Sequence, residues 1–405
     1  MSDEEPKVGT EPGFDGVQRP GFDGPSLAVS VDATAVPERP VGAGRYVVEL
    51  VRALARRDDV RLTVWCRRGD AARWESPGLA VVPCAPPSRP SRLVWEQAGL
   101  ARRLRTAGVA VHHGPHYTMP VLCPVPSVVT VHDLTLVEHP EWHERSKVVV
   151  FRRAIALARR RATAIVCPSA ATATRLAATG GASGRVFVVP HGVDHDRFGP
   201  HEAWPGADAA ALRGVGVRPP YLLFLGTLEP RKAVPVLVDA FDRLAGVHRD
   251  LTLVLAGGAG WGSDEVERSV AAAVHRSRIV RTGYVAETAV PALLRRAAAV
   301  CYPAIEEGFG LPALEAAACG TPLVTTAGSV MAEMVGDAAV LAEAGSAPSV
   351  AAALAVALAG GADGERRRAA GLAAAAERTW AASAAGHVEA YRWAAGRQPP
   401  RAGGT

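Results

Sequence analysis

The sequence contains very little lysine and no closely paired cysteines. Lysine occurs only at Lys7, Lys147 and Lys232, whereas the other 42 of the 45 basic residues are arginine. None of the six cysteines belongs to a Cys-x-x-Cys pair, which argues against a disulfide framework or a zinc ribbon and favours reduced thiols. A lysine in such an arginine-rich background is a candidate for a specific role, and Lys232 becomes one below.

Long apolar runs are also missing. The longest ones reach about five to eight residues, whereas a helix that spans a bilayer needs about 20. The first residues, MSDEEP, are acidic and lack the apolar segment of a secretory signal. We therefore expect a cytoplasmic protein.

The length and the charge distribution narrow the class further. With 405 residues the chain suits two α/β domains better than one core. Residues 1–200 contain 26 basic and 20 acidic residues, and residues 201–405 contain 19 and 20, so an anionic partner is expected at the first half. The basic residues are dispersed and no recognition motif occurs, so nucleic-acid binding is not expected.

Buried apolar runs alternate with helical stretches in both halves, which predicts parallel sheets covered by helices on both faces. In the first half the expected strands are Leu27–Val31, Leu62–Trp65, Val109–Val111, Val128–Val131, Ile165–Cys167 and Val186–Val189. In the second half they are Tyr221–Leu225, Leu251–Ala256, Ile279–Arg281, Val300–Tyr302, Leu323–Thr325 and Val340–Leu341. Ligands of such sheets collect at the carboxyl ends of the strands.

The predicted fold class is therefore α/β, with two Rossmann-like β/α/β domains that face each other across a cleft. The expected organisation is a disordered tail at 1–25, a first domain at 26–200, a linker at 201–218, a second domain at 219–378 and a C-terminal helix at 379–397. The Pro/Gly/Ala composition near 200–220 suggests the linker.

The densest functional signal is the segment PAIEEGFGLPALEAAACGTPLVTT at 303–326. Gly308 and Gly310 precede a helix that Leu311-Pro312 opens, so the backbone can approach a ligand and expose amides at the helix N-terminus. This arrangement suits a diphosphate. Glu307 and Glu315 flank it, and each can accept hydrogen bonds from a hydroxyl, one on a sugar and one on a ribose; solvated glutamates are the alternative interpretation.

A second signal is FLGTLEPRK at 224–232. A buried strand ends at Gly226, and Arg231 and Lys232 lie just beyond it. Adjacent cations at the end of a strand can neutralise a leaving diphosphate, as a metal ion does elsewhere. Alone they would indicate a solvated basic turn, but the glycine-rich turn of the same half favours a phosphate site.

The glycine turn PVGAGRY at 40–46 resembles the opening of a dinucleotide fingerprint. Its third glycine position holds Val47, and Cys66 at the end of the next strand is followed by arginines, so NAD binding is poorly supported. A turn around Gly44 that approaches phosphate or acceptor remains a reasonable expectation.

His132 ends the strand motif VTVHDL, where an imidazole can hold an acceptor or accept a proton; a structural histidine is equally well supported. The short patterns HHGPH at 112–116 and DHD at 194–196 lack a convincing set of metal ligands. No metal and no other cofactor is therefore expected.

Taken together, these motifs resemble the retaining glycosyltransferases of the GT-B superfamily, specifically glycosyltransferase family 4. The resemblance extends from Leu27 to about Ala395 and rests on GAGRY (42–46), VHDL (131–134), PHGVD (190–194), GTLEPRK (226–232) and EGFGLPALEAAACGTPLV (307–324). The Glu-x7-Glu segment is the most specific of these. GAGRY and VHDLTLVEHPEWH are most similar to a bacterial branch with mannosyltransferases of polysaccharide assembly.

The resemblance implies a nucleoside-diphosphate sugar as donor, a glycan or lipid-linked acceptor, and transfer with retention and without a metal, in which the departing phosphate helps to deprotonate the acceptor. It also implies that 26–200 is the acceptor-side domain, that 219–378 binds the nucleotide sugar, and that the helix at 379–397 packs back on the first domain. The implied catalytic residues are His132, Arg231, Lys232 and Glu307. The implied donor-binding residues are Gly44, Gly226, Phe309, Gly310, Leu311 and Glu315. Ala233 and Ala304 depart from common family residues, but neither removes a charged group.

Two other functions stay open, a sugar-nucleotide 2-epimerase and a sugar-nucleotide-binding protein without catalysis. The segment ERSKVVVFRRAIALARRR at 144–161 predicts a basic amphipathic helix. Such a helix suits peripheral contact with an anionic membrane at its inner face, and a core-packed helix with a solvated face is the equal alternative.

Overall fold

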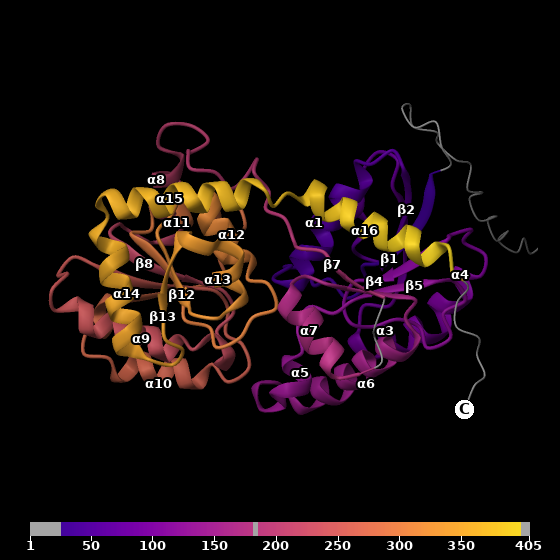
Figure 1. The fold of residues 1–405 in the computed structure, drawn as a ribbon, viewed down its shortest axis with the longest axis horizontal. Coiled ribbons are helices and arrows are strands. Elements are labelled where there is room, and N and C mark those ends of the chain that lie inside the picture. The colour runs from indigo at the N-terminus through magenta and orange to yellow at the C-terminus, as the bar shows by residue number, and fades with distance from the viewer. Residues whose placement is uncertain (1–25, 181–184, 398–405) are drawn as a thin grey trace, which may run out of the picture.

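The computed structural model describes residues 26–180 and 185–397, so the predicted tail at 1–25 lies outside the described residues. Two parallel sheets form two separate domains, which lie side by side along the long axis of the molecule (Figure 1). The fold class predicted from the sequence is thereby confirmed.

The first sheet has seven parallel strands in the order β3-β2-β1-β4-β5-β6-β7. Its strands are β1 (Leu27–Asp32), β2 (Val60–Arg67), β3 (Ala80–Ala85), β4 (Val111–Gly114), β5 (Ser127–Thr130), β6 (Ala164–Cys167) and β7 (Val186–Val188). Its helices are α1 (Ala43–Ala55), α2 (Ala71–Trp74), α3 (Arg89–Trp95), α4 (Ala101–Leu104), α5 (Thr135–Glu138), α6 (Arg145–Arg161) and α7 (Ala170–Ala178), with a π-helical turn at Glu96–Leu100.

The second sheet has six parallel strands in the order β10-β9-β8-β11-β12-β13. Its strands are β8 (Tyr221–Leu225), β9 (Thr252–Ala256), β10 (Ile279–Gly283), β11 (Ala299–Tyr302), β12 (Leu323–Thr326) and β13 (Ala339–Ala342). The helices that follow the first domain are α8 (Ala207–Val215), α9 (Val234–Ala245), α10 (Asp264–Ala272), α11 (Val290–Arg296), α12 (Leu311–Ala318), α13 (Val330–Val335), α14 (Ala347–Ala359), α15 (Gly361–Ala376) and α16 (Trp380–Ala395).

Two strands of the first sheet differ from the expectation. The edge strand β3 was not predicted, because its sequence AVVPCA contains Pro83, which interrupts the apolar pattern but is tolerated at a sheet edge where no partner needs its N–H. The strand expected at Val109–Val111 lies further along, at β4, because His112 and His113 belong to it. Both imidazoles are fully buried and hydrogen-bonded, His112 to Ser30 at 2.9 Å and His113 to Thr130 at 2.8 Å.

The region after the first domain also contains more structure than its composition suggested. Helix α8 lies within the predicted linker, and its buried Asp208 accepts a hydrogen bond of 2.7 Å from Arg295 of α11. Near the C-terminus, α15 ends at Ala376 and α16 begins at Trp380, with Thr379 capping α16, so that α16 lies within the helix expected at 379–397.

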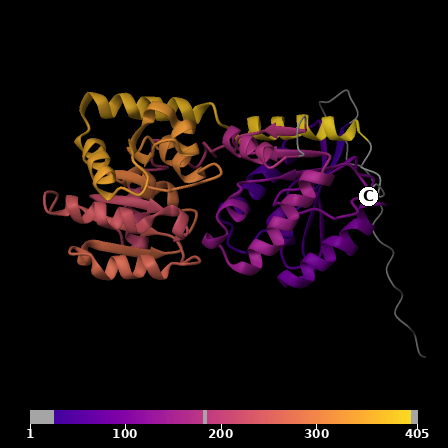
Figure 2. The same ribbon diagram turned by 60° about the horizontal axis from the view of Figure 1, so that its bottom comes forward.

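Helix α16 leaves the second domain and lies across the first one (Figures 1 and 2). Its Tyr391 hydroxyl is 2.8 Å from Nδ1 of His113 on β4, and its His387 Nε2 is 2.8 Å from the hydroxyl of Tyr46 on α1. The same Tyr46 hydroxyl is 2.8 Å from the hydroxyl of Thr130 on β5. The C-terminal helix is therefore part of the core of the first domain.

In the described part of the chain, no single helix is both long and apolar enough to cross a membrane. Helices α14 and α15 reach that length and composition only as a pair, and they meet at an angle of 96°.

Candidate active site

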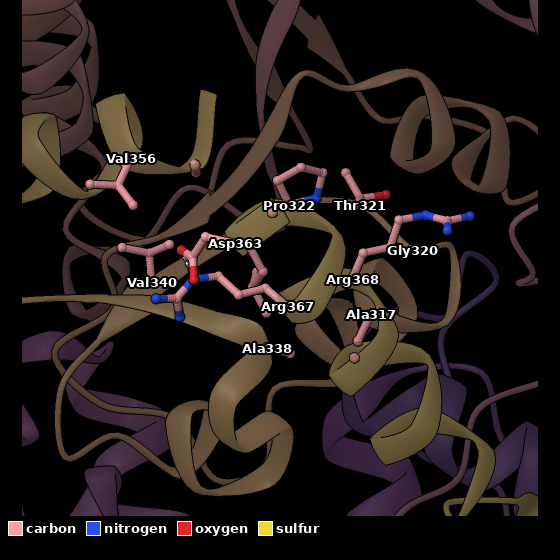
Figure 3. A pocket seen from close by; sticks show the side chains of 14 residues that line it. Ala317, Gly320, Thr321, Pro322, Ala338, Val340, Val356, Asp363, Arg367 and Arg368 are labelled. Atoms are coloured by element: carbon pink, nitrogen blue, oxygen red, sulfur yellow. Dashed lines mark hydrogen bonds and ion pairs between the residues drawn. The ribbon is translucent and has the colours of Figure 1, made fainter. Parts of the chain in front are cut away.

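A large cavity of about 790 Å³ lies between the two domains. Its walls include the segments that follow β1 and β5 in the first domain and β8 and β11 in the second. These are the carboxyl ends of central strands, where ligands of α/β sheets bind. A second cavity, between α12, α15 and the start of β12, measures only about 20 Å³ (Figure 3), and Arg367 in it pairs with Asp363 at 2.9 Å. The interdomain cavity is the candidate site.

Nearly all of the residues predicted for the site line this cavity. They are Gly44, His132, Gly226, Arg231, Lys232, Glu307, Phe309, Gly310 and Leu311. The exception is Glu315, which is absent from the lining and lies behind Arg45. The sequence prediction thus selected residues that the fold brings together from both domains.

The glycine-rich turn after β11 has the geometry of a ligand-approaching loop. Gly310 has a φ of +85° and caps α12, and a Cβ atom there would lie 2.3 Å from Cγ of Met331. Gly308 faces the first domain, because a Cβ atom on it would lie 2.1 Å from the carbonyl oxygen of His132. Glycine is therefore required at both positions, once for the backbone conformation and once for the approach of the domains.

Arg231 and Lys232 form one ion cluster with Glu307. Arg231 Nη1 lies 2.7 Å and Lys232 Nζ 2.9 Å from the two carboxylate oxygens of Glu307. Arg231 also donates to the carbonyl oxygen of Glu306 at 3.3 Å and pairs with Glu229 at 3.0 Å. The two cations are thereby fixed beside the turn that precedes α12.

The cluster keeps its members ionised. Burial would raise the pKa of Glu307, but the charges and hydrogen bonds of Arg231 and Lys232 outweigh burial and lower that pKa to about 2. Burial would lower the pKa of Arg231, but Glu307 and Glu229 outweigh it and raise that pKa. With Glu229, which pairs with Arg231, the group contains two positive and two negative charges, which sum to zero. Lysine and arginine carry several N–H donors, so both cations can bind a further anion while they hold Glu307.

His132 lies at the end of β5 with only 8% of its surface exposed. Its Nε2 is 2.9 Å from the carbonyl oxygen of Pro115, and since a carbonyl only accepts, Nε2 carries the proton and Nδ1 keeps a lone pair. Burial lowers the pKa of the ring, so it is neutral at neutral pH. The imidazole is consequently suited to accepting a hydrogen bond from a hydroxyl, more than to storing a proton.

Glu315 contacts a residue to which the sequence analysis gave no role. Arg45 Nη2 lies 2.5 Å from Oε1 and Arg45 Nη1 lies 3.2 Å from Oε2 of this carboxylate. Arg45 is on the first turn of α1 and Glu315 is in α12, so the pair joins the two domains. Burial would lower the pKa of Arg45, but Glu315 outweighs it and the pKa is raised.

A second ionic contact between the domains involves Glu306, which sequence reasoning also missed. Its carboxylate pairs with Arg175 of α7 and lies 3.7 Å from Nε2 of His139. Arg45 follows Gly44 and Glu306 precedes Glu307 in the sequence, and both neighbours are predicted site residues. This adjacency is the only feature of the sequence that could have indicated a role for Arg45 and Glu306. Their partners could not be identified, because each lies in the other domain.

The metal-like sequence patterns have other uses in the fold. His112 and His113 form the buried hydrogen bonds described above, and Asp194 accepts one from the backbone of Asp196 at 3.1 Å. Across residues 26–180 and 185–397 no group of three or more His, Cys, Asp or Glu side chains has the arrangement of a metal site.

The basic helix predicted at 144–161 is α6, and its apolar side packs inward. Val148, Ile155 and Ala158 are buried, and Phe151 packs against the core cluster that contains Ile155 and Ala158. Arg152 and Arg153 are exposed. The helix therefore presents charge to the solvent and keeps its apolar side in the protein.

Comparison with known proteins gives two family matches that follow one another along the chain. The model described as "Glycosyltransferase Family 4" matches residues 40–197, and the model described as "Glycosyl transferases group 1" matches residues 213–376. The first match covers strands β2 to β7 of the first sheet, and the second covers all six strands of the second sheet.

Individual proteins show the same similarity. The chain is 30% identical to D-inositol 3-phosphate glycosyltransferase of Xylanimonas cellulosilytica, over 94% of this chain and 100% of that protein. It is 28% identical to O-antigen chain mannosyltransferase B of Escherichia coli, over 70% of this chain and 74% of that protein. Among solved structures, Anabaena HepE in complex with UDP and glucose has a TM-score of 0.71 at 19% identity, over 90% of this chain and 98% of that one.

Proposed function

The chain belongs to glycosyltransferase family 4 and has the GT-B fold, and from this premise we propose that it moves a hexose from a nucleoside-diphosphate sugar to a glycan or lipid-linked acceptor, with retention and without a metal. The single observation that carries the proposal is the cluster of Arg231, Lys232 and Glu307 beside the glycine-rich turn of α12 in the interdomain cavity. The UDP and glucose of the HepE complex support the donor class, and the relative in Escherichia coli makes mannose the first sugar to test.

In this proposal the second domain holds the donor. The backbone amides of Phe309, Gly310 and Leu311 at the start of α12, together with Arg231 and Lys232, bind the diphosphate. Glu307 stays ionised because of its cationic neighbours, so it accepts hydrogen bonds from hydroxyls of the sugar. Glu315 does the same for the ribose.

The chemistry then requires little proton storage by the protein. The bond from the anomeric carbon to the phosphate oxygen breaks, and the bond to the acceptor oxygen forms on the same face of the sugar. The hydroxyl proton of the acceptor goes to the departing phosphate, whose negative charge Arg231 and Lys232 stabilise. The neutral His132 orients a hydroxyl through Nδ1, which its buried position and its bond to Pro115 favour.

Removal of either partner in the cluster tests the proposal. Purified Glu307→Ala and Lys232→Ala should each lower kcat for hexose transfer by roughly 100-fold or more, because each loses a preorganised charge at the reacting diphosphate or sugar. Transfer is measured with UDP- and GDP-linked glucose and mannose, and Arg268→Ala, an exposed residue of α10, serves as the matched control. Near-normal transfer by either variant would show that the site is assigned incorrectly.

The products of the reaction and its dependence on metal test the retaining mechanism, the metal independence and the two alternative functions. NMR of the product should show the anomeric configuration of the donor, and activity should persist in EDTA. An inverted product or loss of activity on chelation contradicts the mechanism. Conversion of the sugar nucleotide to its epimer without an acceptor would instead support the 2-epimerase function, and donor binding without turnover would support an inactive binding protein.

The location of the enzyme forms part of the same proposal. A cytoplasmic enzyme that uses a lipid-linked acceptor would touch the inner face of the membrane through the exposed arginines of α6, Arg152 and Arg153 among them. Because the apolar side of α6 is packed in the protein, this contact would be electrostatic. Sedimentation with anionic vesicles at low and high salt tests it, and absence of binding at low salt removes it.

A further inference from the structure

Arg45 separates Glu315 from the cavity in which the donor is proposed to bind. Arg45 is one of the residues that line the cavity and its side chain is 16% exposed, whereas Glu315 is not among them and its side chain is only 2% exposed. Both carboxylate oxygens face the same guanidinium, at 2.5 and 3.2 Å. A hydroxyl that approaches from the cavity therefore meets Arg45 before it reaches Glu315.

We propose that Arg45 controls access of the donor's ribose to Glu315, so that the ribose hydroxyls and the guanidinium compete for one carboxylate. This inference rests on the proposed function, in which Glu315 binds the ribose. Arg45 does not touch the reacting atoms; it acts through Glu315 and sets the affinity for the nucleotide, chiefly for its ribose.

The surroundings of Arg45 fit a side chain that can leave its partner. Its Nε is buried without a hydrogen-bond partner, and its guanidinium carbon lies 5.7 Å from the ring centre of Phe198. Glu315 is the only ion-pair partner recorded for it among the described residues. The pair also crosses between two domains, so its contribution depends on their relative position, unlike the pair of Arg52 and Glu49 within α1.

Competition between Arg45 and the ribose predicts the direction in which nucleotide affinity changes when Arg45 is removed. If the apo protein spends most of its time with Glu315 occupied, the apparent affinity for a ligand that needs this carboxylate is reduced by that fraction. Removal of the guanidinium frees Glu315 and strengthens only the part of binding that comes from the ribose hydroxyls. A 2′,3′-dideoxy nucleotide has no such hydroxyls, so its affinity reports everything else, including any attraction between Arg45 and the diphosphate.

The experiment is calorimetric titration of wild type and Arg45→Ala with GDP and UDP and with their 2′,3′-dideoxy forms. The ratio of the dideoxy Kd to the ribo Kd should rise about fivefold in Arg45→Ala, the lower end of typical coupling between sites. Arg45→Lys keeps the charge but loses the two-point contact, so its ratio should fall between the two. Arg52→Ala, on the same helix, should leave the ratio unchanged.

Failure of the Arg45 inference and failure of the proposed function give different results. An unchanged or lower ratio in a folded Arg45→Ala, judged by circular dichroism, overturns the inference. The donor KM should fall in this variant with little change in kcat, and a change confined to kcat contradicts the inference as well. If wild type binds neither nucleotide, or if Glu315→Ala keeps the wild-type ratio, the proposed function fails at the ribose assignment, independently of Arg45.

Discussion

At the scale of single residues, the candidate site depends on charges that are held ready before any ligand arrives. Glu307 is kept ionised by two cations, and both cations line the cavity and carry more than one N–H donor. The glycines of the turn permit this arrangement, since they allow the backbone of one domain to approach the other. Gly308 is the clearest case.

Replacing Gly308 by alanine should disrupt catalysis while leaving both domains folded. A Cβ atom at this position would lie 2.1 Å from the His132 carbonyl oxygen, which is too close for two non-bonded atoms. The first domain therefore has to move away from the turn that contains Gly308. A displacement of about 1 Å at a reacting site can lower a rate by about 100-fold, and we expect a loss of that order in kcat. Steady-state transfer kinetics and a thermal melt measure the two effects.

Gly364→Ala provides the control for this change. Gly364 lies in α15, where an added Cβ meets nothing within 4 Å, so alanine should raise stability by roughly 0.5–1 kcal/mol and leave kcat unchanged. Equal kcat values for the two variants would mean that the approach of Gly308 to His132 has no part in the reaction.

The residues of the site could largely be predicted from the sequence, because each motif places its side chains at the end of one strand. Gly226, Arg231 and Lys232 follow β8, and Glu307 follows β11. The partner of Glu315 could not be predicted in this way. Arg45 is 270 positions away, and only the packing of the two domains brings the pair together.

At the scale of secondary structure, α16 supplies buried side chains that complete the core of the first domain. Its Tyr391 and His387 belong to one hydrogen-bonded network with Tyr46, His113 and Thr130. All of these side chains are fully buried. A buried polar network stabilises a fold only when every member is paired.

Tyr391→Phe should therefore destabilise the first domain. The variant leaves Nδ1 of the buried His113 without its partner at 2.8 Å, which typically costs about 1–3 kcal/mol. The free energy of unfolding from urea denaturation measures the loss. Tyr284→Phe, at a tyrosine that is 40% exposed, should stay within about 0.5 kcal/mol of wild type, and a similar change in both variants would contradict a role of the network.

The elements that could be predicted are those with an uninterrupted pattern. The buried central strands β8 and β11 have continuous apolar runs, and the run of β1 is interrupted only by Ser30. Helix α12 has a proline near its start and Gly320 shortly after its end. Strand β3 was missed because of Pro83, and α8 was hidden in a Gly- and Pro-rich segment. The C-terminal helix was expected at 379–397, and α16 begins at Trp380, close to that bound.

At the scale of the whole molecule, the two domains differ in how they respond to acid. Burial lowers the pKa of seven histidines, all of them in the first domain or on the helix that packs against it. They are His112, His113, His116, His132, His143, His191 and His387. For two of them, His112 and His387, the pKa in the folded protein is about 4, against an ordinary value of 6.5.

The sign of the resulting pH dependence follows directly. Below pH 6.5 these histidines take up protons in the unfolded chain but not in the folded domain. Their contribution to the free energy of unfolding is therefore complete above pH 6.5 and is lost as the pH falls toward 4. Each such histidine contributes up to about 1.4 kcal/mol per pH unit. Hydrogen exchange at pH 7.5 and pH 5 should show early loss of protection in β4 and β5, while β8 and β11 stay protected. Equal loss in both sheets would contradict this assignment.

The position of α16 also has a consequence during synthesis. Most of the first domain is translated before residue 200. The position of α16 beside Tyr46 and His113 stays empty until the ribosome has made the second domain and then residues 380–395. The nascent chain thus carries an incomplete first domain, with polar groups that will later be paired, throughout the translation of the second. Helix α16, which is translated after the second domain, thus completes the first domain.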